Sequence, residues 1–258
     1  MIRLLTMAVL ALPVAAQTPT FELASVRPQP WTNEGQVAVY VRGNTLYSEH
    51  ADLYTLIDFA WNLPPDSSQV TGGPWWARHG GLSNVAGEGE RLFQVIAKAP
   101  EGSSPTAEEF RQMLQSLLAE RFRLRVRVTN REQPVFHLVA AKDGPKVTAS
   151  APDAEPSLRL ADGKVFRISA VHTPIAVLVD ELGAPSHGAG RPVVDQTGLT
   201  GFYDFEIEWV PGDVMAPEVD GKAATVFSAV GKLGLKLEPG TAVVPVVAIE
   251  HAEMPSAN

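Results

Sequence analysis

The sequence predicts an α+β fold built from two related units, and three observations carry that prediction. Apolar and polar residues alternate over short stretches, which is the pattern of half-buried strands. Apolar residues with helical spacing occur in short runs, so each helix is expected to cover one face of a small mixed sheet. The same order of patterns occurs twice along the 258 residues. We therefore expect a duplicated unit of strand, helix, strand, strand, helix, strand and strand.

The first unit is expected to begin with a strand at residues 37–47. A short helix follows, because Leu53, Leu56, Ile57 and Ala60 fall on one helical face. The remaining elements, in order, are expected to be strands at 69–73 and 93–98, a helix at 106–120, and a hairpin with strands at 122–126 and 134–139.

The second unit repeats this order from a strand at residues 165–170. Ile175, Leu178, Val179 and Leu182 mark its first helix with the same spacing of apolar residues. The remaining elements are expected to be strands at 191–195 and 202–209, a helix at 223–232, and a hairpin with strands at 233–237 and 245–250.

Residues 1–16 are expected to be a secretory signal peptide. Arg3 precedes a short apolar run, which ends with Val14 and Ala16 at the two constrained positions of a cleavage site. The run is shorter than the ~20 residues that a transmembrane helix needs. We expect a protein that is periplasmic or extracellular, with no transmembrane segment in the mature chain. The alternative is a buried N-terminal strand or helix.

The remaining chain is divided by a polar, proline-bearing linker at residues 148–156. It separates a first half at 17–147 from a second half at 157–258. Two further polar stretches, at 80–90 and 211–222, are expected to be surface loops.

Composition narrows the classes of function. The chain has a net charge of −8 and no cysteine. The lack of thiols excludes disulfide scaffolds, cysteine-ligated zinc, iron–sulfur clusters and thiol catalysis. The acidic balance argues against nucleic acid, whose binding needs a basic face. We expect no cofactor and no metal, and a partner that is a protein or a small ligand of the cell envelope.

The first candidate binding site is a turn with two adjacent tryptophans. Trp75 and Trp76 follow Gly72 and Gly73 at the end of an expected strand. Paired aromatic side chains at such a place can form a platform for a partner. The alternative is that one tryptophan packs into the core while the other covers a sheet edge.

The second candidate is the corresponding turn of the second unit, at Asp195, Thr197 and Gly198. Its carboxylate is expected to accept backbone N–H groups in an Asx turn, which makes the turn a structural feature or part of a binding surface. An alternative is a secreted hydrolase with a dispersed polar site, in which Asp195 acts with His172 or His187. The Gly-x-Ser-x-Gly and Ser-x-x-Lys motifs of serine hydrolases do not occur, so we expect no enzyme and assign no catalytic residue.

Two smaller features are a row of arginines and a pair of possible metal ligands. Arginines at every second position from Arg121 to Arg127 are expected to share one face of a strand, either solvated beside Glu120 and Glu132 or facing an acidic partner. His251 and Glu253 lie two residues apart. Two residues supply too few ligands for a structural metal site.

Eight motifs in order resemble an uncharacterised family of exported proteins. The resemblance covers nearly the whole chain after residue 16. The motifs are FELASVRP at 21–28, GGPW at 72–75, AKAP at 97–100, MLxxLLxxRFxL at 113–124, RExPVF at 131–136, RPVVDxTGLxGxYDF at 191–205, LGLKLE at 233–238 and EMPSAN at 253–258.

This family is expanded in soil bacteria and carries a domain of unknown function, so the resemblance implies no activity. Some of its members are attached to membrane metallopeptidase sensors, which implies a sensing or interaction role. Each half is also similar to the N-terminal modules of secretins and TonB receptors, on the helix and Gly-Leu-x-Leu stretch at 233–237. We expect a non-enzymatic binding or interaction module.

Overall fold

Residues 18–29, 38–64, 68–77, 92–161, 163–212 and 225–255 are described by a computed structural model of the chain. These residues form four helices and twelve strands in three sheets, which confirms the predicted α+β class. The expected signal peptide, the loop at 80–90 and most of the loop at 211–222 lie outside the described residues.

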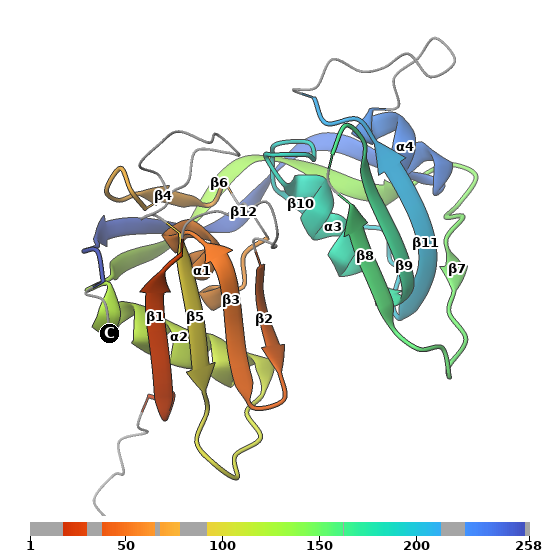
Figure 1. Ribbon diagram of the computed structural model, residues 1–258. Coiled ribbons are helices and arrows are strands. Elements are labelled where there is room, and N and C mark those ends of the chain that lie inside the picture. Colours follow the sequence, from red (N-terminus) through yellow and green to blue (C-terminus); the bar gives the residue numbers. More distant parts are fainter. Residues whose placement is uncertain are drawn as a thin grey trace, which may run out of the picture.

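The first lobe is a four-stranded antiparallel sheet with two helices on one face (Figure 1). Its inward residues, among them Leu46 and Val95, share a core with Leu56 and Leu114 of the helices. The strands, in sheet order, are β1 (Leu23–Pro28), β5 (Phe93–Lys98), β3 (Thr45–Ala51) and β2 (Ala38–Arg42), and the helices are α1 (Leu53–Ala60) and α2 (Ala107–Arg121).

Both helices of this lobe begin at a side-chain cap. The Asp52 carboxylate accepts the Thr55 N–H at 2.7 Å ahead of α1. Thr106 and Glu109 form a reciprocal capping box ahead of α2. These caps satisfy N–H groups that have no partner within the helix, and so they fix where each helix begins.

The second lobe repeats this plan (Figure 1). Its core brings together Ile168 and Ile207 of the sheet with Leu178 and Val230 of the helices. The strands, in sheet order, are β7 (Thr148–Ala149), β11 (Phe202–Trp209), β9 (Phe166–Pro174) and β8 (Ser157–Ala161), and the helices are α3 (Ile175–Gly183) and α4 (Val226–Lys232). Strand β7 lies inside the predicted linker at residues 148–156.

A long antiparallel ribbon of β6 (Arg125–Ala140) and β12 (Leu235–His251) joins the lobes (Figure 1). Strand β12 contributes Val247 to the core of the first lobe and Leu237 to the core of the second. Unfolding of β12 in one core therefore disturbs a strand that also belongs to the other core.

Each half also contributes a short parallel strand to the ribbon. β4 (Val70–Gly72) pairs with β12, and β10 (Val193–Asp195) pairs with β6. A strand from the first half thus lies beside the last strand of the second half, and the reverse is also true. This gives a mixed sheet in the order β10-β6-β12-β4.

The two predicted hairpins are wrong. Residues 122–139 and 233–250 do not each turn back on themselves; apart from the first residues of each stretch, they extend as β6 and β12, which pair with each other. Alternation of period two identifies a strand but not its partner, and the polar residues between the expected arms lie within the strands rather than in turns. The strand expected at 37–47 is instead a hairpin of β2 and β3, which turns at Gly43 with a φ of 59°.

The two halves run through the same order of elements, from β2 to β6 and from β8 to β12. Even an unusual backbone conformation recurs. His50 and His172 both have positive φ values, 52° and 48°, and each lies three residues before the first residue of a helix, α1 and α3 respectively. A non-glycine residue in this region is uncommon, so its occurrence at matching places shows how closely the two chain paths agree.

Candidate functional site

The turn after β4 is fixed by close contacts with the ribbon. Gly72 and Gly73 have φ values of 76° and 83°, a region that side chains disfavour. A Cβ at Gly72 would lie 3.0 Å from the Ile249 carbonyl oxygen, and one at Gly73 would lie 3.0 Å from the Ile249 side chain. The Tyr54 hydroxyl donates to the Gly72 carbonyl at 2.7 Å. The turn is therefore held against both α1 and β12.

The two tryptophans that follow have opposite environments. Trp76 is 7% exposed and lies in the core of the first lobe, with its ring centroid 6.4 Å from that of Phe122. Trp75 is 73% exposed. They do not form a joint platform, but a single exposed indole stands on a turn whose next residue is buried.

The second predicted turn uses its polar atoms internally. The Asp195 carboxylate accepts the backbone N–H and the hydroxyl of Thr197, both at 2.8 Å. The Thr197 hydroxyl in turn accepts the Leu199 N–H at 3.1 Å, and Gly198 has a φ of 72°. This is the expected Asx turn, and its described hydrogen bonds are local.

The histidines proposed as partners of Asp195 bond elsewhere. The His172 N–H donates to the Asp204 carboxylate at 2.9 Å. His187 Nε2 lies 2.9 Å from a Glu181 carboxylate oxygen. The hydrogen bonds of Asp195 to Thr197 therefore bring it together with neither histidine.

Sequence reasoning missed a chain of hydroxyl, imidazole and carboxylate in the second lobe. The Ser186 hydroxyl lies 2.9 Å from His187 Nδ1, while Glu181 is bonded to the opposite ring nitrogen. The imidazole is stacked on Phe166 at 3.8 Å between centroids. Ser186 and His187 are adjacent in sequence, so no spaced motif pointed to them.

These hydrogen-bonded side chains of Ser186, His187 and Glu181 lie where the polypeptide closes over the end of α3. The N–H groups of Gly188 and Ala189 donate to the carbonyls of Ala184 and Leu182 at 2.8 and 2.7 Å. They satisfy carbonyls at the carboxyl end of the helix, so they are not available to stabilise an oxyanion.

Asp180 of α3 is the one described carboxylate with a strongly perturbed acidity in this lobe. Burial, together with the negative charge of Glu181, raises the pKa of Asp180 to about 6. The negative charge of Asp180 is therefore disfavoured by the fold near neutral pH.

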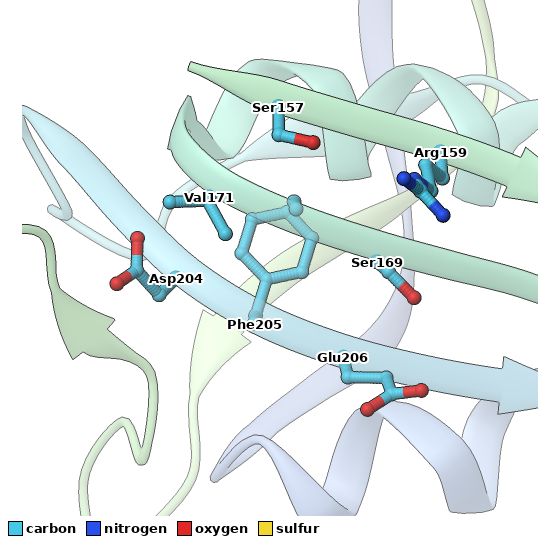
Figure 2. Close-up of a pocket in the computed structure, with 8 residues that line it drawn as sticks. Ser157, Arg159, Ser169, Val171, Asp204, Phe205 and Glu206 are labelled. Atoms are coloured by element: carbon cyan, nitrogen blue, oxygen red, sulfur yellow. The ribbon is translucent and has the colours of Figure 1, made fainter. Parts of the chain in front are cut away.

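A shallow hollow of about 560 Å³ lies on the sheet of the second lobe (Figure 2). Arg159 of β8 and Glu206 of β11 stand on either side of Ser169, in agreement with the strand register. Hydrogen bonds from Ser150 and from the His172 backbone lower the pKa of Asp204, which also lines the hollow. The lining residues are Ser157, Arg159, Ser169, Ala170, Val171, Asp204, Phe205 and Glu206.

The arginines from Arg121 to Arg127 do not share one face of a strand, and that prediction is wrong. Arg121 ends α2 and pairs with Glu120 at 3.1 Å, and Arg123 has a φ of 48° between the helix and β6. Arg127 lies on β6 and pairs with Glu250. Helix α2 extends further than the alternation suggested, so only the last two arginines are on the strand.

His251 and Glu253 form a pair at 2.9 Å. Within the described ranges, no group of three or more histidines and carboxylates is placed to hold a metal ion. Nor does any helix in the described part of the chain have the length and apolar character needed to cross a membrane.

Comparison with known proteins gives one match. The model of a family described as a protein of unknown function, DUF3738, matches residues 54–252. No curated protein and no solved structure matches the chain. The resemblance to secretin and TonB-receptor modules therefore stays a prediction.

Proposed function

Because the chain belongs to DUF3738, a family of unknown function, we propose from its own surfaces that it is an exported, non-enzymatic interaction module that binds a partner protein of the cell envelope. The observation that carries this proposal is the exposure of Trp75 on a fixed turn. Tryptophan is enriched among the residues that dominate binding energy at protein interfaces.

Three features support Trp75 as the anchor. Its indole is 73% exposed, so a partner has apolar area to cover. The positive φ values of Gly72 and Gly73 and the hydrogen bond from Tyr54 hold the turn. Trp76, the residue that follows Trp75, is anchored in the core by its buried side chain. An anchor held this way loses little conformational freedom on binding.

The place of action is proposed from the N-terminal sequence. Residues 1–16 have the charge, the short apolar run and the cleavage pattern of a signal peptide. A periplasmic or extracellular location follows, and a sensing role is compatible with the binding of an envelope partner.

The experiment is capture of a partner from envelope extracts of the native host by the immobilised chain, followed by crosslinking mass spectrometry. We expect a protein that is retained by the wild type and lost with Trp75→Ala. The matched control is Val243→Ala, because Val243 is a similarly exposed apolar residue on β12. If the Trp75 variant captures the same protein as well as the wild type, the anchor is wrongly assigned.

One observation favours a second candidate, hydrolysis with Ser186 as nucleophile: the hydrogen-bonded chain of Ser186, His187 and Glu181. In serine hydrolases the nucleophile bonds to Nε2 and the acid to Nδ1, which is the reverse of the arrangement here. A fluorophosphonate probe tests this candidate. Labelling of the wild type that Ser186→Ala abolishes would support a hydrolase and contradict the non-enzymatic proposal.

We also propose that the halves arose by duplication of one unit. The repeated order of elements, the matching φ values at His50 and His172, and the reciprocal placing of β4 and β10 support it. The two halves on either side of the predicted linker, 17–147 and 157–258, would be the descendants of that unit.

A further inference from the structure

Strand β8 is an open edge of the second-lobe sheet. It pairs with β9 on one side, and no described strand pairs with its other side (Figure 1). A strand edge presents N–H and C=O groups that can pair with another extended chain. All five residues of β8 are exposed.

The side chains on this edge are unusual for a strand exposed to water. Leu158 and Leu160 are 45% and 42% exposed, and they share one face of the strand. Natural edge strands are commonly protected by charged side chains, especially lysine, by proline or by a bulge. In β8, whose sequence is SLRLA, the only such feature is the single charge of Arg159.

Arg159 lies between the leucines on the opposite face. It has no ion pair among the described residues, whereas Arg167 on the neighbouring strand is paired with both Glu206 and Glu208. Arg159 also lines the hollow beside the strand. An unpaired cation at the centre of an open edge has a free position for an anion directly across from it.

We propose that β8 receives an extended segment of a partner protein as a fifth strand of this sheet. The segment carries an aspartate or glutamate opposite Arg159, and apolar residues on either side pack against Leu158 and Leu160. Main-chain hydrogen bonds supply affinity, and the alternating side chains supply specificity. This surface is separate from the Trp75 turn, and the proposal does not depend on it.

The charge of Arg159 favours a partner over a second copy of the chain. If two copies paired through β8 with Arg159 at the centre of the register, the two guanidinium groups would be directly opposite each other. Like charges at such positions are destabilising.

The test is selection of linear peptides from a random displayed library, with the wild type and Arg159→Glu as separate baits. We expect the wild type to enrich sequences with one acidic residue between apolar ones. The variant should enrich lysine or arginine at that place. Arg42→Glu is the matched control, because it makes the same change in net charge on β2, the edge strand of the first lobe.

One enriched peptide is then synthesised and titrated into isotope-labelled protein. Chemical shift changes should map to β8 and β9, and methylation of the peptide's bonding backbone amides should weaken binding more than about tenfold. Arg159→Glu should weaken it about 2- to 30-fold, from the combined loss of an opposite-charge pair and gain of a like-charge pair.

Three outcomes would overturn the proposal. The enriched peptides could lack the alternating acidic pattern, or keep it unchanged with Arg159→Glu. The shifts could map to the Trp75 turn or to β2. A concentration-dependent dimer that competes with the peptide would assign the edge to a second copy of the chain.

Discussion

The sheets of the two lobes have the same arrangement of strands, but the side chains on their outward faces differ in chemistry. Across the first sheet, Tyr40, Tyr47 and Ile96 are paired in one row, and the two tyrosine rings are stacked with centroids 5.6 Å apart. Across the second sheet, the row of matching register contains Arg159, Ser169 and Glu206. The inward faces of both sheets are mainly apolar, although Ser48 and His50 of β3 are also buried.

This difference shows that the inward residues, not the outward ones, specify the fold. The inward alternation of apolar residues recurs because each sheet must bury one face under two helices. The outward residues are free of that demand, so their chemistry can differ between the two lobes. A binding function located on one lobe therefore does not extend to the other by their common fold.

The turns after β4 and β10 show the same contrast. In the first half, the chain passes two glycines and presents an indole to solvent. In the second half, Asp195 and Thr197 bond to each other and close the turn. Four predictions test these contrasts, from the largest expected effect to the smallest.

The largest effect is expected between the two tryptophans. Trp76→Ala should lower the free energy of unfolding by about 3–5 kcal/mol, because it leaves a cavity in the first core. Trp75→Ala should change it by less than about 0.5 kcal/mol, as an exposed position does. Denaturant unfolding of both variants gives the comparison, and similar losses would mean that Trp75 is also structural.

The residues after α2 and α4 should respond in opposite directions. A Cβ at Gly234 would lie 2.1 Å from the Gly144 carbonyl oxygen, and its φ is 65°. Gly234→Ala should therefore cost about 2–4 kcal/mol. At the matching place, Arg123 has a φ of 48°, so Arg123→Gly should stabilise by up to about 1 kcal/mol. Thermal unfolding measures both, and stabilisation by Gly234→Ala would refute the close contact.

Asp180 should make the stability of the second lobe depend on pH. Its pKa is raised from 3.8 to about 6 in the folded protein, so folding is penalised when the carboxylate is charged. The penalty is absent below pH 3.8, grows between 3.8 and 6, and is complete above 6. Asp180→Asn should add about 1–3 kcal/mol of stability at pH 7.5 and almost none near pH 4. Equal gains at both pH values would contradict this assignment.

The smallest effects concern the outward faces. A double-mutant cycle on Tyr40 and Tyr47 should give a coupling of about 0.5–1.5 kcal/mol that persists in salt. The pair of Arg167 and Glu208 is exposed, so its coupling should fade at molar salt. If both couplings responded to salt alike, the chemical distinction between the two faces would be lost.

The sequence predicted much of the local structure. The stripes from Leu53 and Ile175 gave α1 and α3, and the double tryptophan turn gave one of its two alternatives, with Trp76 in the core. The long ribbon escaped prediction because strand periodicity contains no information about a partner about a hundred residues away. The chain of Ser186, His187 and Glu181 escaped it because the closing loop, not a motif, brings these residues together.

The most direct test of the account is the affinity of the captured envelope protein for Trp75→Ala. The account predicts a loss of at least about 30-fold relative to the wild type, the size expected for an interface anchor, with unchanged unfolding and with Val243→Ala binding normally. Undiminished affinity of the folded Trp75→Ala variant would contradict it.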